Sequence, residues 1–441
     1  MEQTLADARH RNDTPLSSRK VRVAVAAVAI TLLAAACSSS KDKSDGKTGS
    51  AGNSGGSSGS GGSSGGGDIV VGGVQDGNFT GIDVGFKARI ARFNQDGGLN
   101  GRKIKLLDVL KDGSSLSGNL TAVQTLALKD KVFAVTPVAS QTFSPSSAQL
   151  LNQRSIPFIG WGINPSMCVG DAAFPVLGCQ ASSDYQSLLL YKQLAAGIGK
   201  PVQGLKTAIV GIDNAGGKSG LEGVAAAVTK AGGTLVYNKA SIPQGGATDY
   251  SPYVQGLLAA NPDVIMLLTD FGPGAALTGA LRQAGYKGGI WNPTAYVPGI
   301  LDKQSQLAQA LNGSLVVAQY PSQEEGAPAA KQVEADLNAI NAPTEMSLGV
   351  TVGWWSAEEF IQQLQATAAK GAVTSANFVK TIHAGWTIKP LPGGISGLTF
   401  PDDQTKPASC GGLMQSDAKG HYTVREKYQC NPSDTVKVSD G

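Results

Sequence analysis

The chain has 441 residues, too many for one ordinary domain, so its length predicts two or more. It carries 36 Lys and Arg residues and 33 Asp and Glu residues, and the resulting net charge of +3 gives no electrostatic reason to expect nucleic acid as a partner. Hydrophobic residues make up 41% of the chain, which is enough for sizeable cores.

Residues 1–36 have the pattern of an export signal. A basic cluster at 19–22 precedes an apolar stretch at 23–33 that is too short to span a bilayer stably. The next residues, AAACS at 34–38, resemble a bacterial lipobox, in which small residues precede a Cys whose thiol accepts diacylglycerol. We therefore expect a lipoprotein signal peptide at 1–36 and a lipid anchor at Cys37. The alternative is ordinary secretory cleavage beside an incidental Cys.

Residues 37–67 are expected to form a tether. From position 41 onward they are almost all Gly, Ser, Lys and Asp, a composition that cannot bury apolar area and behaves as a flexible coil. A long tether behind a lipid anchor suits a domain that works beside a membrane partner. We therefore expect an extracytoplasmic protein held at the cell membrane.

The cysteines that follow Cys37 support export. An even number of them in an exported chain predicts disulfides, and four cysteines allow three pairings. Pairing nearest neighbours closes the shortest loops, and each such bridge would contribute roughly 3 kcal/mol. Buried free thiols are the alternative, whereas a metal site is not expected because the chain has no C-x-x-C pair and only 3 His. The cysteines concerned are Cys168, Cys179, Cys410 and Cys430.

From residue 68 the chain alternates strand-like and helix-like segments. Short apolar runs predict strands at 69–74, 103–109, 132–138, 157–160, 207–212, 234–241, 264–268, 289–291 and 314–317. Helical patterns predict helices at 81–93, 116–128, 145–151, 185–196, 220–231, 250–260, 275–284, 348–369 and 376–383. Strands that alternate with helices in this way predict βαβ units and parallel sheets, in one series at 68–183 and another at 184–313.

Glycines mark the ends of several of these elements. Gly-Gly pairs at 97–98 and 232–233 follow two of the expected helices, where a C′ glycine belongs. Near the end of the chain, residues 412–428 alternate in polarity around DAKG at 417–420, which predicts a β-hairpin with a Gly-containing turn.

Several segments of the chain carry a family resemblance, beginning with the stretch FNQDGGLNGR at 93–102. This stretch resembles the signature I-N-x-x-G-G-x-x-G of the type I periplasmic binding proteins, and of the leucine/isoleucine/valine-binding proteins above all. Three further pieces agree in order and spacing, and the likeness covers roughly residues 68–383. These pieces are VASQT at 138–142, IPFI at 156–159 followed by Asn164-Pro165, and LRQAGY at 281–286.

The resemblance implies an α/β fold with two doubly wound parallel-sheet lobes, joined by a multi-strand hinge and closing over a ligand. It implies that the first lobe comprises 68–183 plus 318–390, and the second 184–317 plus 391–441. The implied function is to capture a small polar organic ligand, such as an amino acid or a related amide or carboxylate. The partners would be the permease and ATPase of an ABC importer. No cofactor is expected, and we expect a monomer.

The residues themselves place the ligand at the strand ends, because open α/β sheets bind ligands at the carboxyl ends of their strands. Residues 139–143 follow the strand at 132–138, and Ser144-Pro145 then begins a helix whose free N–H groups suit a carboxylate. The alternative is that these residues only cap the helix. With the other strand ends, the expected ligand contacts are Phe79, Ser140, Gln141, Thr142, Gly162, Ile163, Asn164, Asp213, Asp270, Phe271, Thr294 and Tyr296.

Two positions bear on whether the ligand is an amino acid. Asp270 can accept a ligand ammonium, or it can serve as a helix N-cap before Pro273. The family often has an acidic, amine-binding residue near position 294, whereas this chain has Thr294. The sequence therefore puts an amino-acid ligand in doubt, or transfers the amine contact to Asp270.

Three other functions compete with transport. An enzyme is not expected, because His383 and His421 lie near no Ser or Cys motif, and the sequence has no phosphate loop or zinc motif. The match of GSSGG at 62–66 to G-x-S-x-G lies in the expected coil and carries no weight. The remaining alternatives are a ligand-sensing lipoprotein on the same fold that signals to a membrane partner, and a structural lipoprotein whose cleft binds no ligand.

Overall fold

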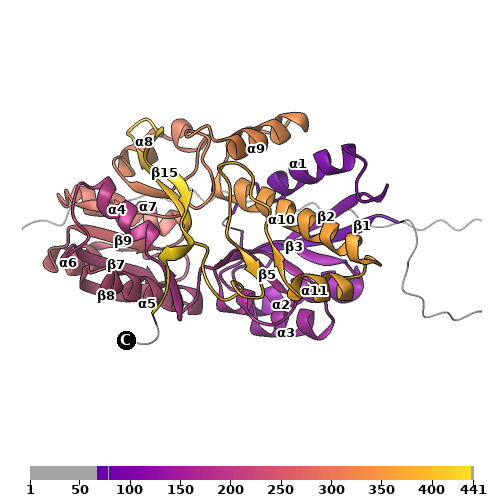
Figure 1. The fold of residues 1–441 in the computed structure, drawn as a ribbon. Helices are drawn as coiled ribbons and strands as arrows, with labels where there is room; N and C mark the ends of the chain where they lie inside the picture. Colours follow the sequence, from indigo (N-terminus) through magenta and orange to yellow (C-terminus); the bar gives the residue numbers. More distant parts are fainter. Residues whose placement is uncertain (1–66, 78, 439–441) are drawn as a thin grey trace, which may run out of the picture. The chain divides into compact units, whose positions relative to one another are not determined.

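The computed structural model describes residues 67–77 and 79–438 (Figure 1). The expected signal peptide, the lipidation site Cys37 and the expected tether up to residue 66 lie outside these residues. Within the described part, no helix has the length and apolar character needed to cross a membrane.

The first lobe is built on a five-stranded sheet in which neighbouring strands are parallel. The strand order β2-β1-β3-β4-β5 shows that the chain starts inside the sheet and then builds it outward on both sides. The inner strands are buried apolar runs, as expected for a parallel sheet covered by helices on both faces. The strands are β1 (Ile69–Gln75), β2 (Ile104–Lys111), β3 (Ala134–Ala139), β4 (Phe158–Gly162) and β5 (Ala173–Cys179).

Helices from two distant parts of the sequence cover this sheet. The long helix α10 packs against α1, α11 and the strands β3 and β4, and its Trp354, Trp355 and Phe360 are completely buried or nearly so. The helices of this lobe are α1 (Ile82–Gln95), α2 (Leu116–Gln124) with a π-helical turn at Thr125–Lys129, α3 (Pro145–Gln153), α9 (Pro328–Ala339), α10 (Leu348–Lys370) and α11 (Ser375–His383).

The second lobe is built on a seven-stranded sheet of order β15-β14-β11-β10-β9-β7-β8. Its first five strands in sequence are parallel, whereas β14 and β15 add an antiparallel hairpin at one edge. The strands are β7 (Lys206–Ile212), β8 (Thr234–Ile242), β9 (Val264–Leu268), β10 (Gly289–Trp291), β11 (Leu315–Ala318), β14 (Cys410–Ser416) and β15 (Tyr422–Cys430). The helices are α4 (Leu189–Gly197), α5 (Ala215–Lys230), α6 (Ser251–Ala259), α7 (Phe271–Gln283) and α8 (Ser305–Ala310).

The C-terminal segment is divided between the two lobes. Ile395, Leu398 and Phe400 are buried in the core of the first lobe, whereas β14 and β15 complete the second sheet. The beginning of this segment thus packs with the first lobe, and the lobe boundaries expected from the sequence stay a prediction. Short pairings complete this region: β12 (Trp386–Thr387) with β13 (Thr399–Phe400), and β6 (Tyr185–Ser187) with β16 (Thr435–Lys437).

The α/β class, the two βαβ series and the C-terminal hairpin are confirmed. Both glycine pairs begin with a left-handed residue, at φ 100° for Gly97 and 95° for Gly232, as a helix C-terminus requires. The helix expected at 185–196 is wrong at its start, because residues 185–187 pair with β16 and the helix begins only at Leu189. The short helices at 165–168, 301–303 and 432–434, together with β5 and α9, were not expected.

Both disulfides pair nearest neighbours in the sequence. Cys168 bonds Cys179, and Cys410 bonds Cys430, with sequence separations of 11 and 20. The first links the loop after β4 to the end of β5, and the second links the start of β14 to the end of β15. The expectation of disulfides is confirmed, and the open question of their pairing is answered.

Helices α1 and α10 approach each other through glycines. A Cβ atom added at Gly353 would lie 1.9 Å from the carbonyl oxygen of Ile82, and one added at Gly85 would lie 1.9 Å from that of Val350. Both distances are far below van der Waals contact with backbone atoms that cannot rotate away. The helices can therefore pack at this distance only with glycine at both positions.

Gly353→Ala is expected to destabilise the protein by about 1–3 kcal/mol, because the added methyl group pushes the two helices apart. In most helices the same substitution stabilises the protein, because Ala is favoured over Gly by about 1 kcal/mol. The control is Gly220→Ala in α5, where an added Cβ meets no atom within 4 Å and a small gain is expected. Urea unfolding of both variants checks the prediction, and a gain in both would contradict it.

Candidate ligand-binding site

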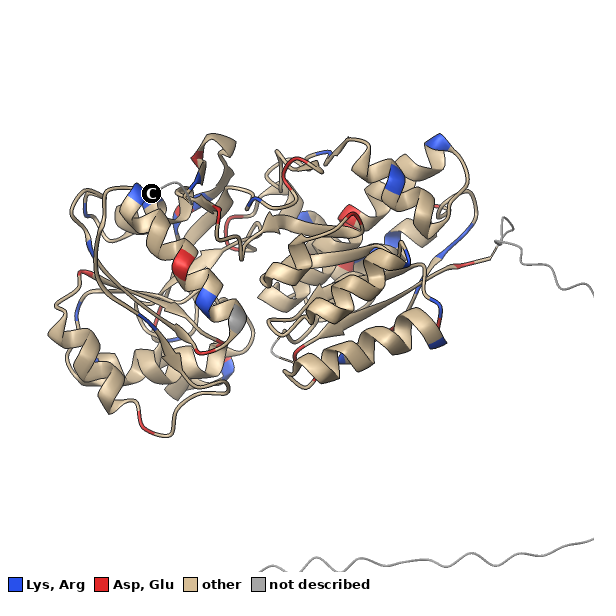
Figure 2. Cartoon of the chain, turned by 90° about the horizontal axis from the view of Figure 1, so that it is seen from below, with Lys and Arg blue, Asp and Glu red and all other residues tan. Residues whose placement is uncertain are grey.

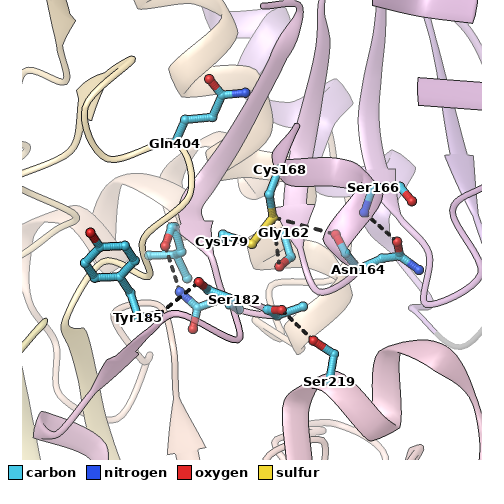
Figure 3. Close-up of a disulfide and its surroundings, with 12 residues drawn as sticks. Gly162, Asn164, Ser166, Cys168, Cys179, Ser182, Tyr185, Ser219 and Gln404 are labelled. Carbon is cyan, nitrogen blue, oxygen red and sulfur yellow. Dashed lines mark hydrogen bonds between the residues drawn. A yellow bond between two sulfur atoms is a disulfide. The ribbon is translucent and has the colours of Figure 1, made fainter. Parts of the chain in front are cut away.

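The strand ends of the two lobes face each other and are joined by hydrogen bonds. Gln141, after β3, donates from Nε2 to Oδ1 of Asp270, after β9, at 2.5 Å. Asn214, after β7, donates from Nδ2 to the side-chain oxygen of Gln141 at 3.4 Å. Ser219 in α5 donates from Oγ to the carbonyl oxygen of Ala181 at 2.9 Å (Figure 3). The described structure thus has the two lobes in direct contact at the expected edge.

A cavity of about 180 Å³ lies between these strand ends and continues into the second lobe. Its outer part is lined by Phe79, Gln141, Trp161 and Ile163 from the first lobe, and Trp161 packs edge-on against Phe79 with ring centroids 5.3 Å apart. Its inner part is lined by apolar side chains from α4, α5 and the strands β9 and β10. These are Leu190, Val224, Ala227, Val228, Met266, Leu268 and Trp291.

The expected contact residues divide into those that line a cavity and those that do not. Phe79, Gln141, Ile163 and Thr294 line the cavity described above, called the interlobe cavity from here on. Asp270 and Phe271 line a second cavity that shares Phe79 and Thr294 with it. The other expected contact residues are absent from the walls of both cavities.

Ser140 and Thr142 are turned toward the interior of the first lobe. Ser140 is completely buried, and its hydroxyl donates to the Asp112 carboxylate at 2.5 Å and accepts from the backbone N–H of Thr142 at 3.2 Å. Ser144 caps α3 through the backbone N–H of Ser146, as expected. The buried Asp112 at the end of β2 thus holds the turn in place, and direct ligand contact by Ser140 and Thr142 stays a prediction.

The remaining expected contact residues hold neighbouring loops. The buried Asn164 donates from Nδ2 to the carbonyl oxygen of Gln141 at 2.7 Å. Asp213 is half exposed and forms an ion pair with Lys218 at 2.6 Å. Tyr296 is buried and donates to Glu324 at 2.7 Å, and burial raises the pKa of its phenol well above the ordinary value.

Glycine and the disulfide shape the loop beside Ile163. A Cβ atom at Gly162 would lie 2.5 Å from the carbonyl oxygen of Gly178, so β4 and β5 can meet here only with glycine. The Cys168–Cys179 bridge lies next to this contact, with Sγ of Cys168 3.6 Å from the carbonyl oxygen of Asn164 (Figure 3). The bridge thereby fixes the chain that leads to Gln180 and Ala181, which line the cavity.

No Asp, Glu, Lys, Arg or His of the described chain lines the interlobe cavity. Over both lobes, acidic and basic residues are interspersed rather than gathered on one face (Figure 2). Among residues 67–77 and 79–438, no cluster of His, Cys, Asp and Glu has the arrangement of a metal site. The interlobe cavity is therefore suited to apolar groups and neutral hydrogen bonds rather than to an ion.

The expectation of strand-end contacts missed the inner wall of the cavity. Gly216, Gly220, Val224 and Ala227 recur at spacings of four and three along α5, so they share one face of that helix, and all line the cavity. This spacing is visible in the sequence, but it does not reveal that small residues leave a space there. Trp291, Met266 and Tyr191 had no sequence signal either, since buried aromatic and aliphatic residues usually only pack.

Burial raises the pKa of Asp270, and the hydrogen bond from Gln141 offsets only part of that shift. A raised pKa means that the state with the lobes in contact binds the proton more tightly than the unfolded chain does. The ionised carboxylate therefore costs stability at neutral pH, and this cost disappears as the pH falls.

Asp270→Asn is accordingly expected to raise the melting temperature at about pH 7, because the amide oxygen still accepts from Gln141 and carries no charge. The difference between variant and wild type should shrink as the pH falls and vanish only below about 3.9, the ordinary pKa of Asp, where the wild-type carboxyl becomes protonated in both the folded and the unfolded state. Thermal unfolding across this pH range is the measurement. If the difference in melting temperature grows as the pH falls, the pKa of Asp270 is not raised in the folded protein.

Comparison with known proteins agrees with this architecture. The family model described as periplasmic binding protein matches residues 70–421. A search of curated proteins finds no match.

Solved structures share the fold at low sequence identity. A branched chain amino acid ABC transporter from Thermus thermophilus with bound valine has a TM-score of 0.67 at 12% identity, covering 83% of this chain and 97% of that one. A fatty acid ABC transporter substrate-binding protein from Thermomonospora curvata has a TM-score of 0.65 at 16% identity, covering 83% and 93%. A solute binding protein from R. palustris in complex with 4-hydroxybenzoate has a TM-score of 0.65 at 16% identity, covering 82% and 97%. The match over most of the chain and the two-lobed α/β fold show that the chain belongs to the type I periplasmic binding protein family.

Proposed function

We propose that this protein is an extracytoplasmic solute-binding component of an ABC importer. It captures a small organic ligand between its lobes and presents the closed form to a membrane permease. In this proposal the first lobe comprises 68–183 plus 318–390 and the start of the tail, and Cys37 carries the lipid anchor. The observation that carries the proposal is the cavity of about 180 Å³, which is lined by residues of both lobes.

The arrangement explains why a ligand would close the protein. Phe79, Gln141 and Ile163 reach the cavity from one lobe, and Thr294 and α5 reach it from the other. A ligand makes all of these contacts only when the lobes are together, so its binding free energy favours the closed state. The Gln141–Asp270 hydrogen bond would add to that preference without contacting the ligand itself.

The solved relatives support a small organic solute but differ in its kind. One has bound valine, one is the substrate-binding protein of a fatty acid ABC transporter, and one is in complex with 4-hydroxybenzoate. Their common property is an apolar body that carries a polar end. The cavity in this chain, whose wall combines apolar residues with neutral polar ones such as Gln141 and Thr294, suits that property.

The experiment is a thermal-shift screen of the purified protein against amino acids, amides, ureas, and aromatic and aliphatic acids. We expect at least one solute to raise the melting temperature, because it binds the folded state only. Small-angle scattering with that solute should show a more compact protein. No shift across the whole panel, and no compaction, would overturn the proposal.

A further inference from the structure

The inner part of the cavity is a built apolar pocket within the second lobe. It lies between one face of the sheet, at Met266 and Leu268, and the helices α4 and α5, at Leu190 and Val224. Apolar cavities of about 150 Å³ in proteins accept a benzene molecule, and this cavity has about 180 Å³. Its size therefore suits one aromatic ring or a short branched chain, with a few further atoms toward the entrance.

Five residues that line the cavity carry a polar atom without a hydrogen-bond partner within the described chain. Two of these atoms, the hydroxyl of Ser187 and the side-chain oxygen of Gln319, belong to partly buried residues. The other three groups are deeply buried. They are the indole N–H groups of Trp161 and Trp291 and the hydroxyl of Thr269, and each belongs to a residue that is at least nine-tenths buried. An indole N–H can only donate, so both Trp residues require an acceptor. A buried donor without a partner carries a substantial cost, which a ligand oxygen would remove.

An ammonium group finds the neutral amide oxygen of Gln319 on the described cavity wall but no counter-charge. The described residues that line the cavity include no carboxylate, and a charged amine without a counter-charge is costly to bury. Asp270 is the acidic residue that directly follows the cavity residue Thr269 in the sequence. However, its carboxylate accepts a hydrogen bond from Gln141, and Asp270 lines the second cavity instead. The unpartnered donors and the lack of acidic residues among the described residues of the cavity wall both favour a ligand that has an acceptor oxygen and no ammonium group.

Resting on the proposed function, we infer that the ligand is a small compound with an apolar body, an oxygen that accepts hydrogen bonds, and no ammonium group. Its ring or branched chain occupies the pocket between α5 and the sheet. Its oxygen accepts from the indoles of Trp161 and Trp291. A neutral amide or ketone has this chemistry, whereas a carboxylate supplies the same acceptor oxygen but carries a charge that no described residue of the cavity wall balances.

The test compares probes that differ only in the amine or the charge, by isothermal titration calorimetry on the purified protein. One series is phenylalanine, 3-phenylpropionate and 3-phenylpropanamide, and the other is leucine, 4-methylpentanoate and 4-methylpentanamide. We expect an amine-free member to bind more tightly than its amino acid by roughly a hundredfold or more. The acid and the amide separate an anionic from a neutral ligand.

Variants test where the apolar body lies. Gly220→Leu fills the pocket from the cavity face of α5 and should abolish binding of the amine-free probe, and Val224→Phe repeats the test at a second position. Glu222→Leu places the same side chain on an exposed position of the same helix and should leave affinity unchanged. Trp291→Phe keeps the ring but removes the N–H, and should weaken binding by roughly tenfold.

The outcomes separate the two proposals. Leucine or phenylalanine binding as tightly as its amine-free partner overturns the ligand class but leaves the solute-binding function standing. The ligand class is likewise overturned, and the solute-binding function stands, if every solute that binds in the wider screen carries an ammonium group. Unchanged affinity in both Gly220→Leu and Val224→Phe overturns the placement of the apolar body. Only a complete lack of binding by all solutes removes the proposed function itself.

Discussion

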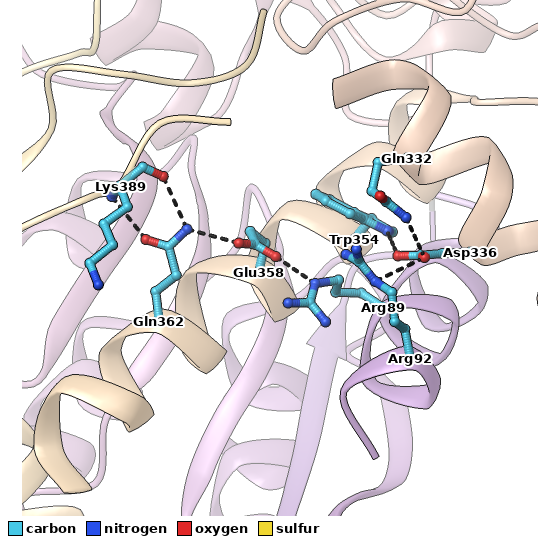
Figure 4. Close-up of polar contacts among 8 residues, drawn as sticks. All are labelled: Arg89, Arg92, Gln332, Asp336, Trp354, Glu358, Gln362 and Lys389. Atoms are coloured by element: carbon cyan, nitrogen blue, oxygen red, sulfur yellow. Dashed lines mark hydrogen bonds and ion pairs between the residues drawn. The ribbon is translucent and has the colours of Figure 1, made fainter. Parts of the chain in front are cut away.

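Glu358→Ala is expected to lower the free energy of unfolding by about 3–5 kcal/mol, because it leaves the Arg89 guanidinium buried without its partner. The side chains of Arg89 and Glu358 are 11% and 6% exposed, and they join α1 to α10 at 2.5 Å (Figure 4). Glu358 also accepts from Gln362 at 2.8 Å, and Gln362 in turn bonds the backbone of Lys389. Removing one carboxylate therefore disturbs a network that joins three segments.

Two control variants make this prediction specific. Glu358→Gln keeps an oxygen for the Arg89 N–H and should lose less than Glu358→Ala. Asp83→Ala breaks an exposed pair with Lys87 on the same helix, where side-chain exposures are 38% and 52%, and should cost no more than about 0.5 kcal/mol. Urea unfolding measures all three variants, and similar losses for Glu358→Ala and Asp83→Ala would contradict the importance of burial.

Replacing both Cys168 and Cys179 with Ser is expected to cost about 3 kcal/mol, since their bridge closes a loop with a sequence separation of 11. It should also weaken ligand binding, because the chain beyond Cys179 supplies Gln180 and Ala181 to the cavity wall. The measurements are the unfolding midpoint and the affinity for whichever solute the screen identifies.

The second bridge provides the matched control for this prediction. Neither Cys410 nor Cys430 lines the interlobe cavity, so replacing both with Ser should cost a similar amount of stability and leave affinity nearly unchanged. Equal losses of affinity in the two double variants would show that the effect is general destabilisation.

The sequence predicts the fold well where local patterns decide it. The strands at 264–268 and 289–291 agree with the structure residue for residue, because short apolar runs between helical segments fit only a buried parallel strand. β5 was not expected, since Pro175 and Gly178 interrupt its apolar pattern. The start of the expected helix at 185–196 fails because β6 depends on β16, a partner some 250 residues away that no local pattern reveals.

The candidate site was predicted in part for a similar reason. Gln141, Ile163 and Thr294 follow strands, so the general geometry of open sheets places them at the cleft. The turn of Ser140 toward Asp112 depends on a carboxylate from a different strand. The inner pocket depends on how far α4 and α5 stand from the sheet, which follows from the combined sizes of many side chains rather than from any motif.

The order in which the lobes use the chain has a consequence for how the protein folds during synthesis and export. The first sheet ends at Cys179, but its main covering helix α10 begins only at Leu348, and the Arg89–Glu358 pair spans 269 residues of sequence. The second sheet likewise needs β15, which ends at Cys430. A chain that emerges from its N-terminus therefore cannot complete either core until nearly all of it has emerged. Premature folding is thereby prevented by connectivity alone, and slow, late assembly is expected of contacts so distant in sequence.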